Sequence, residues 1–246
     1  MSALCGNPPA EPKLFGARLQ CAYAEQAWIK EQLAAGIGGP QLALVEYLRP
    51  ALIYGRRGGD QEAAQRRAGA LGYGVARRSS GGGAVLAGPW LLGVELLLPH
   101  SHVLAQLSPV ESFRWFGRCW QHVLREQGYA SRLADAASIA THNAAAQAAA
   151  VDWICFAGLG HGELLDTEGR KLLGLAQYRG RAGVLLSAGL LLAATPWEDL
   201  EWIHLGQRTR YSTMQQQASA GLPGLQRDLL CQRLVLTLQA ELASAS

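Results

Sequence analysis

Three apolar segments follow one another closely in the second half of the chain, and their spacing constrains the fold more than any other feature. We expect strands at 163–165, 171–179 and 184–193. The turn Asp166-Thr167-Glu168-Gly169 joins the first two into a hairpin, because Asp and Gly are favoured turn residues. Strands that cluster as hairpins, with helices between the clusters, predict an α+β fold with a mostly antiparallel or mixed sheet. A doubly wound parallel sheet is not expected.

The rest of the chain supplies helices and further strands. The expected helices cover residues 17–35, 61–70, 109–127 and 225–242. The expected strands cover residues 42–48, 51–54, 72–78, 90–98 and 151–156. Residues 134–150 are dominated by alanine. They predict either a helix, by propensity, or a mobile surface segment, because few large side chains anchor them.

Capping signals mark several helix ends. Gly36 and Gly38 end the first helix, and Asp60 is expected to cap the second. The segment Thr195-Pro196-Trp197-Glu198 predicts a further helix start, with Thr195 as the N-cap and Pro196 at the first helical position.

Length and composition favour a single globular unit with small appendages. The chain has 246 residues, of which 49% are hydrophobic and 17% charged, enough to bury a sizeable core. We expect a loose N-terminal arm at 1–14, one domain over 15–222, and a C-terminal helix within 223–246 packed on that domain. The domain is expected to hold a central mixed, mostly antiparallel sheet flanked by helices.

Charge and cysteine content exclude several classes of protein. The net charge is only +3, which gives no basic stripe for nucleic acid or a membrane surface. No apolar stretch is long enough to span a bilayer, and the first residues lack the pattern of a signal peptide. The five cysteines are widely spaced and form no CxxC pair, so we expect neither a zinc site nor a disulfide framework. A cytoplasmic location follows from these features.

A run of glycines after two arginines is the first candidate for chemistry. Gly81, Gly82 and Gly83 allow a ligand to approach main-chain N–H groups, which can hold a phosphate or carboxylate oxygen. Arg77 and Arg78 add planar donors for an anion. Because neighbouring side chains in a strand point to opposite faces, only one of the two arginines is expected to face the site. The alternative is a flexible hairpin loop with surface arginines.

Lys171, at the start of an expected strand, is the second candidate. At a period of two it shares a face with Leu173 and Leu175, so its charge is partly desolvated and needs an anionic partner. Gly174 and Ala176 leave the other face thin, which lets a ligand or helix pack closely. The alternative is a hairpin-end lysine in water.

Together these segments resemble a known family. Arg77 through Val85, followed by Gly169 through Gln177, resembles the paired motifs of the biotin/lipoate A/B protein ligase superfamily, in its lipoate–protein ligase and octanoyltransferase branch. Leu52 through Arg56 and Gly183 through Gly189 resemble two further strands of that family. The resemblance covers roughly residues 15–210.

The resemblance implies attachment of lipoate or octanoate to a lysine of a lipoyl carrier domain, such as the glycine cleavage H protein or a 2-oxoacid dehydrogenase subunit. It implies a catalytic role for Lys171, whose charge would stabilise the developing negative charge on carbonyl or phosphate oxygens. It also implies that an acyl and nucleotide pocket is lined by Arg77, Arg78, Gly81, Gly82, Gly83, Ala84, Val85, Gly174 and Ala176.

The sequence departs from the ligase pattern in two places. Ligases commonly follow the glycine run with an aromatic residue and His-Asp, where this chain has Leu86, Ala87 and Gly88. The Asn-Asp pair that often precedes the lysine is not evident before Lys171. The segment Ile154 through Gly158, followed by Gly162 through Leu164, instead resembles the octanoyltransferase branch, where a cysteine at the place of Cys155 carries the acyl group as a thioester. The alternative for Cys155 is a small buried strand residue.

Three hypotheses follow. The first is a lipoate–protein ligase that uses ATP with Mg²⁺ and lipoate and forms an acyl-adenylate. The second is an ATP-independent octanoyl or lipoyl transferase that uses a thioester on Cys155, needs no cofactor beyond the acyl donor, and takes the acyl group from a donor such as octanoyl-acyl carrier protein. The third is a non-catalytic protein that binds an acyl group or a carrier domain.

Overall fold

The computed structural model describes residues 15–56, 58, 61–209 and 211–245. The expected N-terminal arm at 1–14 and the expected helix cap Asp60 lie outside these residues.

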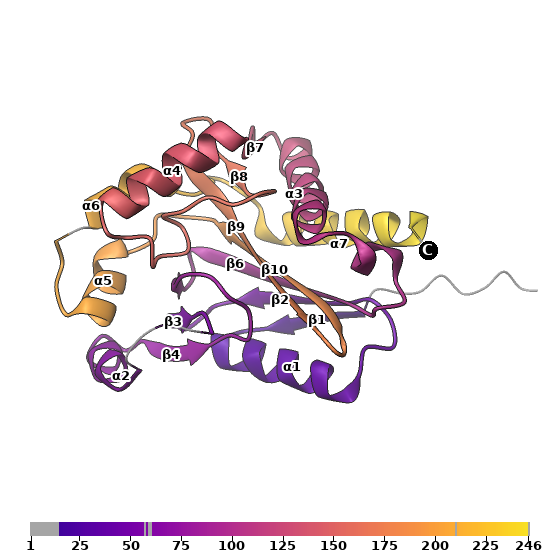
Figure 1. Cartoon of the computed structure of the whole chain (residues 1–246), viewed down its shortest axis with the longest axis horizontal. Coiled ribbons are helices and arrows are strands. Elements are labelled where there is room, and N and C mark those ends of the chain that lie inside the picture. Colours follow the sequence, from indigo (N-terminus) through magenta and orange to yellow (C-terminus); the bar gives the residue numbers. More distant parts are fainter. Residues whose placement is uncertain (1–14, 57, 59–60, 210, 246) are drawn as a thin grey trace, which may run out of the picture.

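A mixed sheet forms the centre of the described structure (Figure 1). Its strands lie in the order β1-β2-β6-β10-β9-β8-β7. β1 and β2 pair in parallel, and all the other neighbours pair antiparallel. The strands are β1 (Phe15–Leu19), β2 (Gln41–Glu46), β6 (Leu91–Leu98), β7 (Arg132–Leu133), β8 (Leu164–Leu165), β9 (Lys171–Gly180) and β10 (Gly183–Leu191). The expected mixed, mostly antiparallel sheet is confirmed.

A smaller sheet carries the arginine and glycine segment. Its order is β4-β3-β5, with β3 parallel to β4 and antiparallel to β5. The strands are β3 (Ala51–Tyr54), β4 (Gly74–Arg77) and β5 (Val85–Ala87). The glycine run therefore lies between the end of β4 and the start of β5.

Helices cover both faces of the central sheet, with α1 on one side and α3 and α7 on the other (Figure 1). The helices are α1 (Ala22–Ala35), α2 (Gln61–Ala70), α3 (Pro109–Glu126), α4 (Ala136–Ala148), α5 (Trp197–Leu205), α6 (Tyr211–Gln217) and α7 (Arg227–Ser244), with a 3-10 turn at Val103–Gln106. The alanine-rich segment is a helix, α4, whose N-terminus is capped by the Asp135 carboxylate at 2.7 Å from the Ser138 amide.

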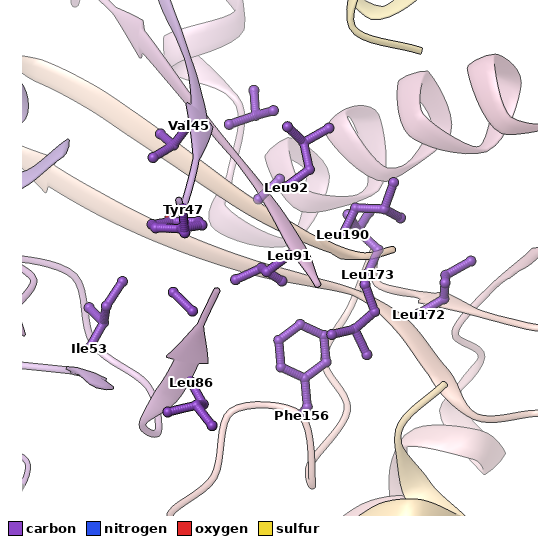
Figure 2. Close-up of a cluster of buried hydrophobic side chains, with 14 of the residues drawn as sticks. Val45, Tyr47, Ile53, Leu86, Leu91, Leu92, Phe156, Leu172, Leu173 and Leu190 are labelled. Atoms are coloured by element: carbon purple, nitrogen blue, oxygen red, sulfur yellow. The ribbon is translucent and has the colours of Figure 1, made fainter. Parts of the chain in front are cut away.

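The core lies where the central strands are apolar on both faces. Every residue of β6 is buried, which fits a strand between β2 and β10 with helices above and below. Figure 2 shows part of this core, where Leu91, Leu173 and Leu190 gather beside the Phe156 ring. The chain thus places the loop that carries Cys155 and Phe156 directly against the sheet.

Four expectations about local structure were wrong or incomplete. The expected helix at 17–35 begins only at Ala22, because residues 15–19 pair with β2 and form β1. The expected strand at 151–156 is a series of turns that touches the smaller sheet only through a bridge between Ala84 and Ile154. Thr195 is not the N-cap of α5: Pro196 occupies that position, without a side-chain cap. Helix α6 was not predicted, since its seven residues are mostly polar.

Among the residues that the structure describes, no helix combines the length and apolar character needed to cross a membrane.

Candidate functional site

An inner cavity lies between helix α1, the central sheet and the loops that carry the glycine run and Cys155. Cross-strand pairing places Ala176, Ser187 and Glu95 in one row on the cavity floor. The neighbouring row holds Gly174 and Gly189, whose missing side chains let the Phe156 ring lie close to the sheet. The walls include Ile29, Ile53, Val85, Leu91 and Phe156. The cavity is thus largely apolar and suits a hydrocarbon chain.

An outer, more open cavity adjoins the inner one. It is lined by residues of the glycine run and of strand β9: Arg78, Gly81, Gly82, Phe113, Cys155, Leu175, Ala176 and Gln177. The inner and outer cavities share Arg78, Cys155, Leu175 and Ala176, so these four residues mark their junction. A molecule with an apolar tail and a polar head can occupy both cavities with its head group at this junction.

The two arginines lie in different surroundings, as strand alternation predicts. Arg77 donates to the carbonyls of Gly55, Arg56 and Gly58 at 3.2, 3.0 and 2.7 Å, and lines neither cavity. Arg78 lines both cavities, and its guanidinium donates to the carbonyls of Gly81 and Gly83. Arg78 thus lies at the candidate site, whereas the resemblance placed both arginines at the pocket.

Within the glycine run, Gly83 packs directly against the backbone of the loop that carries Cys155. A Cβ on Gly83 would lie 2.4 Å from the Trp153 carbonyl oxygen and 2.7 Å from the Cys155 amide nitrogen. A Cβ on Gly81 would meet nothing within 4 Å. Beside Gly83, Ala84 exchanges two backbone hydrogen bonds with the loop, at 2.7 and 2.9 Å. The glycine run therefore holds the Cys155 loop in place.

Lys171 is buried, with 2% of its side chain exposed, and its ammonium group makes three polar contacts. Nζ lies 2.7 Å from Oε2 of Glu163, 2.7 Å from the Cys155 carbonyl oxygen and 2.9 Å from the Gly158 carbonyl oxygen. The expected anionic partner is thus Glu163, from the same chain. Since an ammonium has three N–H donors, all of them are engaged within the protein.

Glu163 is itself fixed by backbone donors. Oε2 accepts from the Gly160 amide at 2.7 Å, and Oε1 accepts from the Leu175 amide at 2.8 Å. The residue precedes β8, and the sequence analysis placed it in an expected strand without giving it a role in the site. The ion pair joins the Cys155 loop to the strand that floors the cavity.

The lysine does not keep the strict alternation expected of its strand. The pairing of β8 with β9 is irregular, with Leu164 opposite Leu173 but Leu165 opposite Lys171. The Lys171 side chain turns toward the loop: Nζ is 5.4 Å from the centroid of the Phe156 ring, and Cε lies 3.5 Å from a Cβ built on Gly174. An irregular register of this kind cannot be read from a period of two.

Cys155 is a free, partly buried cysteine at the junction of the cavities. Its backbone is held on both sides, by the Ala84 carbonyl and by Lys171. Two histidines of the same part of the chain line neither cavity: His142 lies on α4, and His161 is exposed in a turn. Any activation of the thiol must therefore come from other groups at the junction, of which Arg78 is the charged one.

Two buried glutamates of the inner cavity were not predicted. Glu25 lies on α1 and Glu95 in the middle of β6. Burial raises the pKa of both carboxyl groups, and the charge of Glu25 raises the pKa of Glu95 further. The sequence did carry a signal, since Glu95 is the single charged residue in the apolar strand Leu-Leu-Gly-Val-Glu-Leu-Leu-Leu.

Comparison with known proteins places this geometry in a family. The model of the lipoyl protein ligase A/B catalytic domain matches residues 20–220. No curated protein matches the sequence.

Similar solved structures share the fold at low identity. Protein Ta0514 from T. acidophilum, solved with bound lipoic acid, has a TM-score of 0.66 and 16% identity over 95% of this chain and 93% of that one. Lipoate-protein ligase A bound with ATP has a TM-score of 0.61 and 16% identity over 94% and 93% of the two chains. A bipartite lipoate protein ligase from Thermoplasma acidophilum, studied with its E2 lipoyl domain, has a TM-score of 0.62 and 16% identity over 94% and 91%. Because the family model spans most of the chain, this protein belongs to the lipoyl protein ligase A/B catalytic domain family.

Proposed function

We propose that this protein attaches an acyl group, lipoate or octanoate, to a lysine of a lipoyl carrier domain through an acyl-adenylate. The observation that carries the proposal is the pair of joined cavities. The inner one suits the acyl chain, and the outer one brings Arg78, Gly81 and Gly82 to the place where the carboxyl end would lie. Guanidinium and open backbone N–H groups are suited to phosphate oxygens. A relative solved with lipoic acid and another solved with ATP support the same arrangement.

The proposed reaction has two steps. The acyl carboxylate attacks the α-phosphorus of ATP, and pyrophosphate leaves. The amine of the carrier lysine then attacks the acyl carbonyl, AMP leaves, and the nitrogen loses a proton as the amide forms. Positive charge at the junction would stabilise the negative charge on the carbonyl and phosphate oxygens. Arg78 supplies this charge directly.

Lys171 acts in this proposal through the loop that it holds. Its three donors bind Glu163 and two loop carbonyls, so it can contact a substrate only by releasing one of them. We infer that it keeps Cys155 and Gly158 in position above the cavity floor.

The described lining of the outer cavity contains no carboxylate, and Mg²⁺ prefers such oxygen ligands. These residues alone do not fit a protein-bound Mg²⁺, and no step is assigned to it.

Cys155 favours a second candidate, an octanoyl or lipoyl transferase that needs no ATP. Its place at the junction lets a thiolate attack the carbonyl of an incoming thioester, such as octanoyl-acyl carrier protein. The thiol of the acyl carrier protein leaves. The lysine amine of the lipoyl domain then attacks the Cys155 thioester, and the Cys155 thiolate leaves as the amide forms. The missing His-Asp after the glycine run supports this route, and a non-catalytic binding protein is the remaining alternative.

The acceptor proposed for either route is a lipoyl domain of a 2-oxoacid dehydrogenase subunit or the glycine cleavage H protein, in the cytoplasm. One structural relative was studied with its E2 lipoyl domain, which supports the first of these.

Intact mass spectrometry distinguishes the routes. The protein and an H-protein acceptor are incubated with lipoate and ATP, or with octanoyl-acyl carrier protein. Acceptor acylation that requires ATP and survives Cys155→Ser supports the ligase. A covalent adduct on the protein that disappears in Cys155→Ser supports the transferase. No acylation under either condition refutes both routes.

A further inference from the structure

The inner cavity is not apolar throughout, because two carboxyl groups face it. Glu25 and Glu95 are 3% and 4% exposed, and both line the inner cavity but not the outer one. Arg78 and Cys155 lie at the junction. An acyl chain with its carbonyl at the junction therefore has its far end in the part of the site that holds the two glutamates.

The hydrogen bonds of the pair come from three side chains. The Tyr47 hydroxyl donates to Glu25 Oε1 at 2.7 Å, and Gln26 Nε2 lies 3.2 Å from Glu25 Oε2. The Ser187 hydroxyl donates to Glu95 Oε2 at 2.6 Å. Burial raises the pKa of both carboxyl groups, and the Glu25 charge raises that of Glu95 further, which favours the protonated form of Glu95.

This pair has more acceptor sites than donors. An ionised carboxylate offers about four lone-pair sites and a protonated one about three, so the pair offers about seven. Three side-chain donors fill three of them. About four acceptor sites therefore have no side-chain donor beside the cavity. Arg78 carries a positive charge that acts on both groups, but its guanidinium is engaged with the carbonyls of its own loop.

We propose that the inner cavity selects acyl groups whose far end donates hydrogen bonds, such as a chain that ends in a hydroxyl or an amine. The proposal rests on the proposed acyl transfer to a carrier lysine, and it replaces lipoate or octanoate as the preferred acyl group by a chain with a terminal donor. A chain that ends in a plain methyl group displaces water from the carboxyl oxygens and leaves their open sites unpaired. Sites that hydrogen-bond a substrate group discriminate strongly against the analogue that lacks it. Octanoate therefore binds more weakly than a chain of equal length with a terminal donor.

The test is direct binding of free acids to the full chain by isothermal titration calorimetry. The probes are octanoate, 8-hydroxyoctanoate and 8-aminooctanoate, which share the carboxylate and the eight-carbon chain. We expect at least one of the two donor-terminated acids to bind about tenfold more tightly than octanoate. The same preference is measured in Glu95→Gln, which replaces the carboxyl group with an amide, and in Ser187→Ala, which removes the hydroxyl that donates to Glu95.

Glu31→Gln is the matched control, because Glu31 is an exposed residue of the same helix as Glu25 and lines neither cavity. The proposal predicts that the control keeps the preference and that Glu95→Gln reduces it at least threefold. The comparison of probes on the unmodified protein stands even if Glu95→Gln does not fold.

Two outcomes overturn the proposal. If octanoate binds as tightly as both donor-terminated acids and is transferred to an acceptor, the inference is wrong and the proposed function stands. If none of the three acids binds and none is transferred, the proposed function fails together with it.

Discussion

The buried ion pair between Lys171 and Glu163 gives the sharpest test of the site. Lys171→Met keeps most of the side-chain volume but removes the charge, leaving a carboxylate with 5% exposure without its cation. Breaking a buried pair in this way costs about 3–5 kcal/mol. For a chain of this length each kcal/mol lowers the melting temperature by about 2–4 °C, so the expected loss is about 6–20 °C.

The double variant Lys171→Met with Glu163→Gln separates the pair from the rest of the packing. Glutamine keeps one acceptor for the amides that bind Glu163 but removes the unpaired charge. We expect the double variant to be more stable than the sum of the single effects predicts, by about 1–3 kcal/mol.

Differential scanning calorimetry measures all the variants, with Lys30→Met as the control. Lys30 is exposed on α1, and its replacement should change stability by no more than about 0.5 kcal/mol. A Lys171→Met protein that melts within about 2 °C of the unmodified one would refute the reasoning, since that is less than the smallest expected cost. Simple additivity of the two substitutions would refute the coupling.

Three further predictions concern the glycine run, the acid pair and the arginines. Gly83→Ala should destabilise the protein by about 1–3 kcal/mol, because its Cβ meets the loop backbone, while Gly81→Ala should leave the urea unfolding midpoint unchanged. The folded-state pKa of Glu95 is raised, so its contribution to stability is full below pH 4.5 and is lost as the pH rises through the folded-state pKa. Glu95→Gln should therefore flatten the decline of the melting temperature with rising pH. An unchanged slope would contradict this expectation. Of the two arginine variants, Arg78→Ala should cause the larger loss of acyl transfer, because Arg78 lines the outer cavity. Arg77→Ala should cause the larger loss of melting temperature, because Arg77 holds the carbonyls of a neighbouring loop. Equal effects of the two variants would count against the assignment.

The strands that form the floor of the site were predictable because their signals are local. Apolar runs bounded by turn residues identified β6, β9 and β10, and the hairpin turn at 166–169 fixed the pairing of β8 with β9. The alternation of side chains along a strand predicted different surroundings for the two arginines, and only Arg78 lines the two cavities. Strand β1 was missed because its five residues are held by pairing with β2, which no local pattern reveals.

The sequence by itself determined that this chain forms an α+β protein with a glycine run and a strand that begins with a lysine. Only the tertiary structure decided which groups those residues meet. Glu163 reaches Lys171 across an irregular register, and Glu25 comes from a helix 70 residues before Glu95 in the chain. Such pairs form because the folded chain buries both partners in one place, where an uncompensated charge is costly. A pattern of residues along the chain contains neither the burial nor the partner.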